Sequence, residues 1–164
     1  MIPGVDYDDT FFPVAKMVTF RIFLTFVAIY SLETASLDVR TAFLNAKMEK
    51  EVEMLPPPNR KELMRKLLWD PSISFEDTQE ISRQLNLLEN GGILLLLKAL
   101  YGTKEAGRLW YIDIDSFLKN EGFKPNNADH CFYILTVNDT EYVLLLLYVD
   151  DIIIAATSRT LVQK

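Results

Sequence analysis

The short acidic motif Tyr148-Val149-Asp150-Asp151 constrains the fold of this chain more than any other stretch. It lies between two apolar runs, Val143 to Leu147 and Ile152 to Ala156, which are rich in β-prone residues. The pattern predicts two buried strands that meet at a tight turn. Two carboxylates near a core are costly unless a positive charge neutralises them. Because the nearest basic residue in sequence is Arg159, a bound cation is the natural candidate, and an ordinary Asp-containing turn is the alternative.

Composition limits the kind of site that the chain can build. With 164 residues, 49% of them hydrophobic, the chain is expected to form one globular domain with its own core. A single Cys excludes a disulfide framework, and Cys131 is predicted to be a small buried residue in a reducing compartment. One His and one Cys argue against zinc. Metal chemistry would therefore depend on carboxylates, which favour Mg²⁺ or Mn²⁺.

Charge and hydropathy bear on partners and location. The net charge of −6 argues, taken alone, against a nucleic-acid binder. Residues 1–4 lack the features of a signal peptide. The apolar stretch over 17–32 is too short to span a membrane and contains Arg21, and the run over 142–156 is divided by Asp150-Asp151. These features predict a soluble, intracellular chain.

Hydrophobic spacing and turn residues predict alternating helices and strands. Helices are expected over residues 14–31, 59–69, 75–89 and 104–121, and strands over 36–44, 52–55, 93–97, 130–137, 141–149 and 152–156. The first helix would open at Pro13 with Thr10 as a candidate cap, and its apolar face would comprise Val14, Val18, Phe23, Val27 and Tyr30. A polar turn is expected over 45–51. The segment 59–92 carries no catalytic spacing and is interpreted as a peripheral insertion with a solvated charged face, followed by a buried strand at 93–97.

A second acidic position changes the interpretation of the motif. Asp38 interrupts the strand expected over 36–44, where a lone Asp is typical of an exposed face. If this strand pairs beside the acidic turn, Asp38 joins Asp150 and Asp151. Three carboxylates around two divalent ions suit phosphoryl transfer, because one ion activates an attacking 3′-hydroxyl and the other holds the triphosphate. Lys104 and Arg108, one helical turn apart, could contact phosphate or be simply solvated.

Eight different short motifs follow one another along nearly the whole chain, outside residues 59–92, and together they form a recognisable pattern. They are Gly4-Val5-Asp6-Tyr7, Thr10-Phe11, Pro13-Val14-Ala15, Leu37-Asp38-Val39, Thr41-Ala42-Phe43-Leu44-Asn45, Lys98-Ala99-Leu100-Tyr101-Gly102, Trp110-Tyr111 and Tyr148-Val149-Asp150-Asp151. With these motifs the chain resembles the reverse transcriptases of Ty1/copia-type LTR retrotransposons. The resemblance implies an α+β fold, a polymerase palm-like antiparallel sheet with helices packed on one face. Residues 1–35 would be a fingers-side lead-in, 36–58 and 93–164 the palm, and 59–92 a helical insertion.

The resemblance also implies roles for individual residues. Asp38, Asp150 and Asp151 would be catalytic and would hold two Mg²⁺ (or Mn²⁺) ions together with the backbone carbonyl of Val39. Phe43 would be a steric gate that excludes a 2′-hydroxyl, with a core aromatic as the alternative. Since Phe43 follows Asp38 by an odd number of residues, the chain must bend for both to border one site. The remaining residues expected at the nucleotide are Arg21, Lys104, Glu105 and Tyr148.

Some residues depart from the family pattern. Glu105 stands where Gln is usual, and its carboxylate would repel a triphosphate unless Lys104, Arg108 or a metal compensates. Gly107 stands where Pro is common and would leave its loop less rigid. Phe12 replaces a small residue and Ala46 replaces a Gly.

The function implied is RNA-directed DNA polymerase, with a primed RNA or DNA template and deoxynucleoside triphosphates as partners and no membrane. The fingers, thumb and RNase H parts of a parent polyprotein would be further partners, because the chain reads as a partial domain; by itself it is expected to extend no primer. The expected location is the cytoplasmic virus-like particle, with the nucleus as a second site. The alternative is a truncated or decayed, inactive element copy. A nucleotide cyclase is a fainter option, against which the Leu-Tyr-Gly and Trp-Tyr motifs argue.

Overall fold

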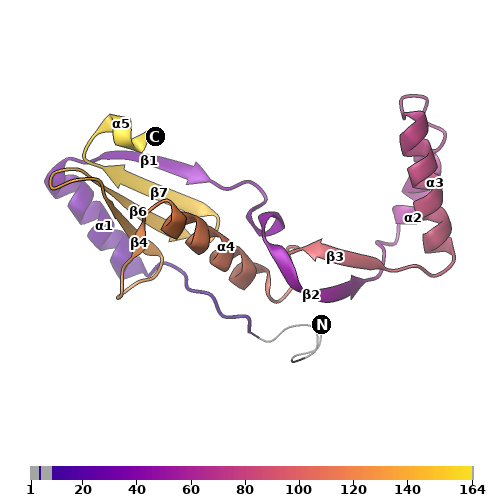
Figure 1. Cartoon of the computed structure of the whole chain (residues 1–164), viewed down its shortest axis with the longest axis horizontal. Helices are drawn as coiled ribbons and strands as arrows, with labels where there is room; N and C mark the ends of the chain where they lie inside the picture. Colours follow the sequence, from indigo (N-terminus) through magenta and orange to yellow (C-terminus); the bar gives the residue numbers. More distant parts are fainter. Residues whose placement is uncertain (1–3, 5–8, 164) are drawn as a thin grey trace. The chain divides into compact units, whose positions relative to one another are not determined.

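The computed structural model describes residues 4 and 9–163 and divides the chain into two compact units. The larger unit comprises Met1–Met48 and Lys98–Lys164, and the smaller one Glu49–Leu97. Both combine helices with antiparallel strands (Figure 1), in agreement with an α+β class. The assignment of palm and fingers stays a prediction.

The larger unit is built on a five-stranded antiparallel sheet in the order β1-β7-β6-β5-β4. The strands are β1 (Glu33–Asp38), β4 (Lys124–Pro125), β5 (Phe132–Thr136), β6 (Tyr142–Tyr148) and β7 (Asp151–Ala156), with a last short helix, α5 (Arg159–Val162). Helices α1 (Met17–Tyr30) and α4 (Ala106–Asn120) lie on opposite faces of this sheet (Figure 1). The expectation that helices pack on one face is therefore wrong. Strand β6 is apolar along its whole length, so both of its faces need cover.

Alternate residues of β6 fill two separate cores. Leu145 and Leu147 pack on the α4 side with Trp110 and Ile114, while residues 144 and 146 pack on the α1 side around the fully buried Phe23. This alternation is the period of two that a strand imposes. The predicted hairpin of β5 and β6 and the strand after the acidic turn are confirmed.

Helix α1 begins at Met17, three residues later than its expected start, and Thr10 does not cap it. Its N-terminus is held from a distant loop, because the backbone N–H of Lys16 donates to Asp129 Oδ2 at 2.9 Å. Of the expected apolar face Phe23 is buried, but Val18 and Tyr30 are more than half exposed. Since this helix is apolar almost all round, its periodicity could not select the buried face.

The strand expected over 36–44 lies over Glu33–Asp38 instead, so the prediction is wrong for residues 39–44 and begins too late. Thr41 adopts a left-handed conformation with φ 51°, and a 3-10 helix, η1 (Ala42–Asn45), follows. The bend that the spacing of Asp38 and Phe43 requires is thus present. The polar turn expected over 45–51 is also wrong, because β2 (Lys47–Met54) begins there. Its exposed charged residues alternate with more buried ones, as in a strand with one solvated face.

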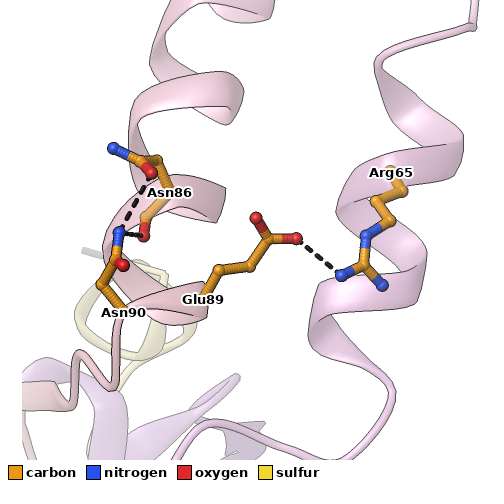
Figure 2. A network of polar contacts seen from close by, with 4 residues as sticks. All are labelled: Arg65, Asn86, Glu89 and Asn90. Atoms are coloured by element: carbon orange, nitrogen blue, oxygen red, sulfur yellow. Dashed lines mark hydrogen bonds and ion pairs between the residues drawn. The ribbon is translucent and has the colours of Figure 1, made fainter.

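The smaller unit contains most of β2, which pairs with β3 (Leu94–Lys98), and the helices α2 (Arg60–Leu67) and α3 (Phe75–Glu89). The predicted bounds of α3 agree with the structure, and the Ser74 hydroxyl caps its N-terminus. The two helices pack through Met64, Leu85 and Leu88. Near the end of α3, Arg65 Nη2 lies 2.6 Å from Glu89 Oε1, and Asn90 Nδ2 donates to the Asn86 carbonyl at 2.8 Å (Figure 2). The strand predicted over 93–97 is present as β3, but the prediction that it is buried is wrong, because its side chains are exposed or half-buried.

Helix α4 is close to its predicted extent, and Gly122 ends it with φ 91°. Its apolar side chains Ala106, Leu109, Trp110, Ile114 and Leu118 recur at helical spacing and are buried, whereas Phe117 is 57% exposed. Gly107 lies buried in the first turn, against the ring of Phe12. In the part of the chain that the structure describes, no helix combines the length and apolarity needed to cross a membrane.

Candidate active site

Two predicted acids face each other across neighbouring strands. The register of β1 and β7 places Asp38 directly opposite Asp151. The backbone N–H of Val39 donates to the Asp150 carbonyl at 2.9 Å. The neighbouring residues Val39 and Asp150 therefore occupy the hydrogen-bonded position of the ladder. Asp38 and Asp151 therefore form a non-hydrogen-bonded pair, in which side chains on the same face come closest. Like charges at such a pair destabilise a sheet unless a cation compensates.

Tyr148 extends this pair into a row. It lies opposite Asp151 in the register of β6 and β7, so Tyr148, Asp151 and Asp38 lie side by side on three neighbouring strands. Tyr148 is 55% exposed, and both acids are exposed. A pocket of about 350 Å³ adjoins the row, with mostly apolar lining from the start of α1 and from β1, β6 and β7.

Asp150 belongs to the two-residue turn between β6 and β7. The first residue of this turn, Val149, has φ 59°, a conformation that favours Gly, Asn or Asp and that is an outlier for a β-branched side chain. Its carbonyl accepts a hydrogen bond of 2.6 Å from Nε1–H of Trp110 on α4. The turn is thus tied to α4 through Val149 and to β1 through Asp150.

The donor set suits a hard divalent cation, because carboxylate and carbonyl oxygens are its preferred ligands. Within the described residues, the carboxylates of Asp38, Asp150 and Asp151 have neither an ion pair nor a hydrogen bond, so their oxygens remain available. The side chains are nevertheless not gathered: the described residues contain no group of three or more His, Cys, Asp or Glu side chains placed to hold an ion. The acids suit a divalent cation because they are carboxylates and because strand pairing and the turn place them at the same end of neighbouring strands. Since the side chains of Asp38 and Asp151 are exposed, they are free to change rotamer.

Phe43 lies on η1, outside the strand that carries Asp38. Its ring centroid is 4.5 Å from that of Tyr101, with a tilt of 33° between the planes. The half-buried side chain also packs against both buried clusters of the α4 side. Its surroundings are therefore compatible with the core alternative as well as with the gate, and the gate stays a prediction.

The other predicted nucleotide contacts are placed in different environments. Lys104 is exposed, while the neighbouring Glu105 is only 2% exposed at the start of α4. A carboxylate buried to this extent does not face solvent, where a triphosphate would meet it. Arg21 is exposed on α1 and forms no ion pair with the described residues. The structure thus groups Tyr148 with the acids, and no contact joins Arg21 or Lys104 to them within the described residues.

Asp129 anchors the start of α1 and was not found from the sequence. Its buried carboxylate accepts hydrogen bonds from Thr19 Oγ1 and from the backbone N–H groups of Lys16 and Cys131. Burial acts to raise the pKa of Asp129, but these hydrogen bonds outweigh it and hold the pKa below its usual range. The signal in the sequence was an Asp just before a strand, which predicts a local turn but not a bond to α1.

A partly buried polar network lies on the α4 side of β5. The Tyr133 hydroxyl donates to Asp115 Oδ1 at 2.9 Å, and Lys119 Nζ lies 2.6 Å from Oδ2 of the same carboxylate. Cys131 is buried, as predicted. Burial, with the nearby carboxylates of Asp129 and Asp115, raises the pKa of its thiol to about 12.

The fold and the acidic turn define a mixed α and antiparallel β domain that presents carboxylates where two strands meet. Sequence comparison then gives the family: the chain belongs to the family described as "Reverse transcriptase (RNA-dependent DNA polymerase)", whose profile matches residues 1–66 and 85–164. The unmatched residues 67–84 fall inside the predicted insertion.

Three of the relatives are retrovirus-related Pol polyproteins of transposons. The chain is 32% identical to that of TNT 1-94 from Nicotiana tabacum over 98% of its own length, and 32% identical to that of RE1 from Arabidopsis thaliana over 99%. It spans only 10% and 9% of the length of these two proteins. RE2 of Arabidopsis thaliana is 30% identical over 98% of the chain and 9% of its own length. These matches confirm the resemblance to Ty1/copia-type elements; no solved structure matches the chain.

Proposed function

We propose that this chain is the nucleotidyl-transfer core of an RNA-directed DNA polymerase from a Ty1/copia-type retrotransposon. The observation that carries the proposal is the strand pairing that sets Asp38 opposite Asp151, with Asp150 in the adjoining turn. These carboxylates lie at one end of neighbouring strands and have no basic partner among the described residues, and a divalent cation would compensate their negative charge. Family membership supports the same chemistry.

Asp38, Asp150 and Asp151, with the backbone carbonyl of Val39, would hold two Mg²⁺ or Mn²⁺ ions. When bound, such ions supply activation of a 3′-hydroxyl and neutralisation of the triphosphate charge. The task of the protein is to fix the carboxylates in position. Pairing of β1 with β7 fixes Asp38 against Asp151, and hydrogen bonds to Trp110 and Val39 hold the turn that carries Asp150.

The nucleotide would lie between this acidic edge and η1. Phe43 would act as the steric gate, and its contact with Tyr101 supports a fixed ring position. The exposed side chains of Tyr148, Lys104 and Arg21 would contact the nucleotide or its phosphates. For Glu105 the buried position supports an indirect role, through the first turn of α4.

The template, the primer and the polyprotein context are part of the same proposal. A primed RNA or DNA template would bind together with fingers, thumb and RNase H parts of a polyprotein, since the relatives are Pol polyproteins. The net charge of −6 means that most phosphate contacts would come from those parts. Residues 1–35 would belong to the fingers side, 36–58 and 93–164 to the palm, and 59–92 to an insertion. The place of action would be the cytoplasmic virus-like particle and the nucleus.

The test is primer extension on an RNA template by the polyprotein that contains this chain. Asp38→Asn and Asp150→Asn should each lower turnover at least about 100-fold, because loss of a metal ligand removes stabilisation of the transition-state charge. Asp139→Asn, a change at an exposed acid in the β5–β6 hairpin, is the matched control and should leave extension unchanged. Near-normal extension by either acid variant would refute the assignment. No extension by the unmodified protein would favour the decayed, inactive copy.

A further inference from the structure

The acidic turn contains a strained residue. Val149 has φ 59° although its side chain is β-branched, at a turn position that Gly, Asn or Asp normally occupies. Such conformations are strained and persist only where the surroundings enforce them. The strained residue directly precedes Asp150, so whatever enforces its conformation also sets the direction in which the chain carries Asp150 and Asp151.

The contact made to the strained residue itself comes from an indole, while the Val39 N–H holds the following residue, Asp150. Nε1–H of Trp110 donates to the Val149 carbonyl at 2.6 Å, a short bond for an N–H donor. The Trp110 side chain is 4% exposed and packs in the α4-side core with Ile114 and Leu147. Because its ring is fixed by packing, its N–H has little freedom to follow the turn, and the turn must instead conform to the ring.

We propose that Trp110 is a positioning residue, which holds the Val149-Asp150 turn in its strained conformation and thereby aligns the carboxylates of Asp150 and Asp151 for a divalent cation. The inference rests on the proposed function for the identity of the ligand. The competing interpretation is that Trp110 is a core aromatic whose N–H merely needs a partner. Both interpretations predict a loss of stability on substitution, so stability cannot separate them.

The two interpretations are distinguished by two proteins: the single variant Trp110→Phe and the double variant that combines it with Val149→Gly. The first change keeps an aromatic ring in the core and removes the donor. The second removes the strain, because Gly adopts a positive φ without penalty, so the turn no longer needs the indole. A positioning role predicts that Trp110→Phe loosens the turn and that the double variant recovers it. A packing role predicts no recovery. Trp69→Phe, at an 89% exposed tryptophan of the smaller unit, is the matched control.

The experiment uses the purified 164-residue chain and two readouts. Amide hydrogen exchange at residues 149–151 should accelerate in Trp110→Phe and return towards the unmodified rate in the double variant. Mn²⁺ affinity, measured by electron paramagnetic resonance titration, should fall about 10-fold in Trp110→Phe, as is typical for residues that orient metal ligands, and recover in the double variant. Asp151→Asn should abolish the same binding, and Trp69→Phe should change neither readout.

The outcomes distinguish the two proposals. Unchanged exchange and unchanged Mn²⁺ affinity in Trp110→Phe, with a lower melting temperature, would overturn the positioning role while leaving the metal site intact. Loss without recovery in the double variant would also overturn it. If the unmodified chain and Asp151→Asn bind Mn²⁺ equally, the proposed metal site is refuted. The proposal that Trp110 aligns the carboxylates for a cation is then refuted as well. The exchange data would in that case show only that Trp110 restrains the turn.

Discussion

Gly107 and Phe12 are the subject of the sharpest stability prediction. A Cβ added at Gly107 would lie 2.2 Å from Cε1 of Phe12, 2.5 Å from Cζ and 2.7 Å from Cδ1. These distances are far inside van der Waals contact, so the ring of Phe12 would have to move. Both residues were noted as departures from the family pattern. The geometry indicates that they are a compensating pair: the large ring occupies the space that the missing side chain leaves.

The expected magnitude follows from two opposed effects. In a helix Ala is favoured over Gly by about 1 kcal/mol. Overpacking typically costs about 1–3 kcal/mol. Gly107→Ala in the unmodified chain should therefore lower the free energy of unfolding by up to about 2 kcal/mol. In a Phe12→Ala background the obstacle is gone, and the same change should raise the free energy of unfolding by up to about 1 kcal/mol.

The assay is a double-mutant cycle in urea, followed by circular dichroism. The sign of the Gly107→Ala effect should invert between the two backgrounds, with a coupling energy of about 1–3 kcal/mol. Equal effects in both backgrounds would refute the reasoning, since they would show that the ring of Phe12 does not oppose a side chain at position 107.

Three further predictions concern single residues. If Phe43 is a steric gate, Phe43→Val should raise ribonucleotide incorporation in the polyprotein while deoxynucleotide use is kept; if it is a core aromatic, sugar discrimination should stay the same and stability should fall by about 1–3 kcal/mol. Cys131 should resist thiol reagents at pH 8 until the chain unfolds, because its pKa of about 12 leaves almost no thiolate; rapid labelling of the folded chain would contradict this. The pKa of Asp129 is lowered on folding from its ordinary 3.8, so its stabilising contribution is present above that pH and is lost as the pH falls through the lower folded value. Urea unfolding of Asp129→Asn across this acid range should accordingly show a weaker dependence of stability on pH.

Elements with local signals were predictable from the sequence. The bounds of α3 follow from the Ser74 cap and from a terminating Gly pair, both of which act within a few residues. Strands β6 and β7 follow from uninterrupted apolar runs around the acidic turn. The pairing of Asp38 with the turn could be suggested because both acidic positions lie on predicted strands that can be neighbours in one sheet, and the structure supplies Asp151 as its direct partner.

Elements set by distant contacts were not predictable. The start of α1 depends on Asp129, which lies over a hundred residues away and accepts hydrogen bonds from the backbone N–H of Lys16 and the hydroxyl of Thr19 in place of a local cap. The first part of β2, residues 47–51, was predicted as a turn because its charged side chains line a solvated face; only its end was expected to be a strand. The bond from Trp110 to Val149 joins a helix to a turn, and no periodicity in either segment indicates it.

The two tryptophans of the chain fall one to each compact unit, in opposite environments. Trp110 is 4% exposed and hydrogen-bonded, whereas Trp69 is 89% exposed. The blue-shifted emission of Trp110 therefore reports the larger unit almost alone, because Trp69 emits as in solvent whether the chain is folded or unfolded. Unfolding followed by this emission and by circular dichroism, which detects the helices of both units, becomes a built-in test of cooperativity: coincident transitions mean that the two units unfold as one, and staggered transitions mean that each unfolds by itself.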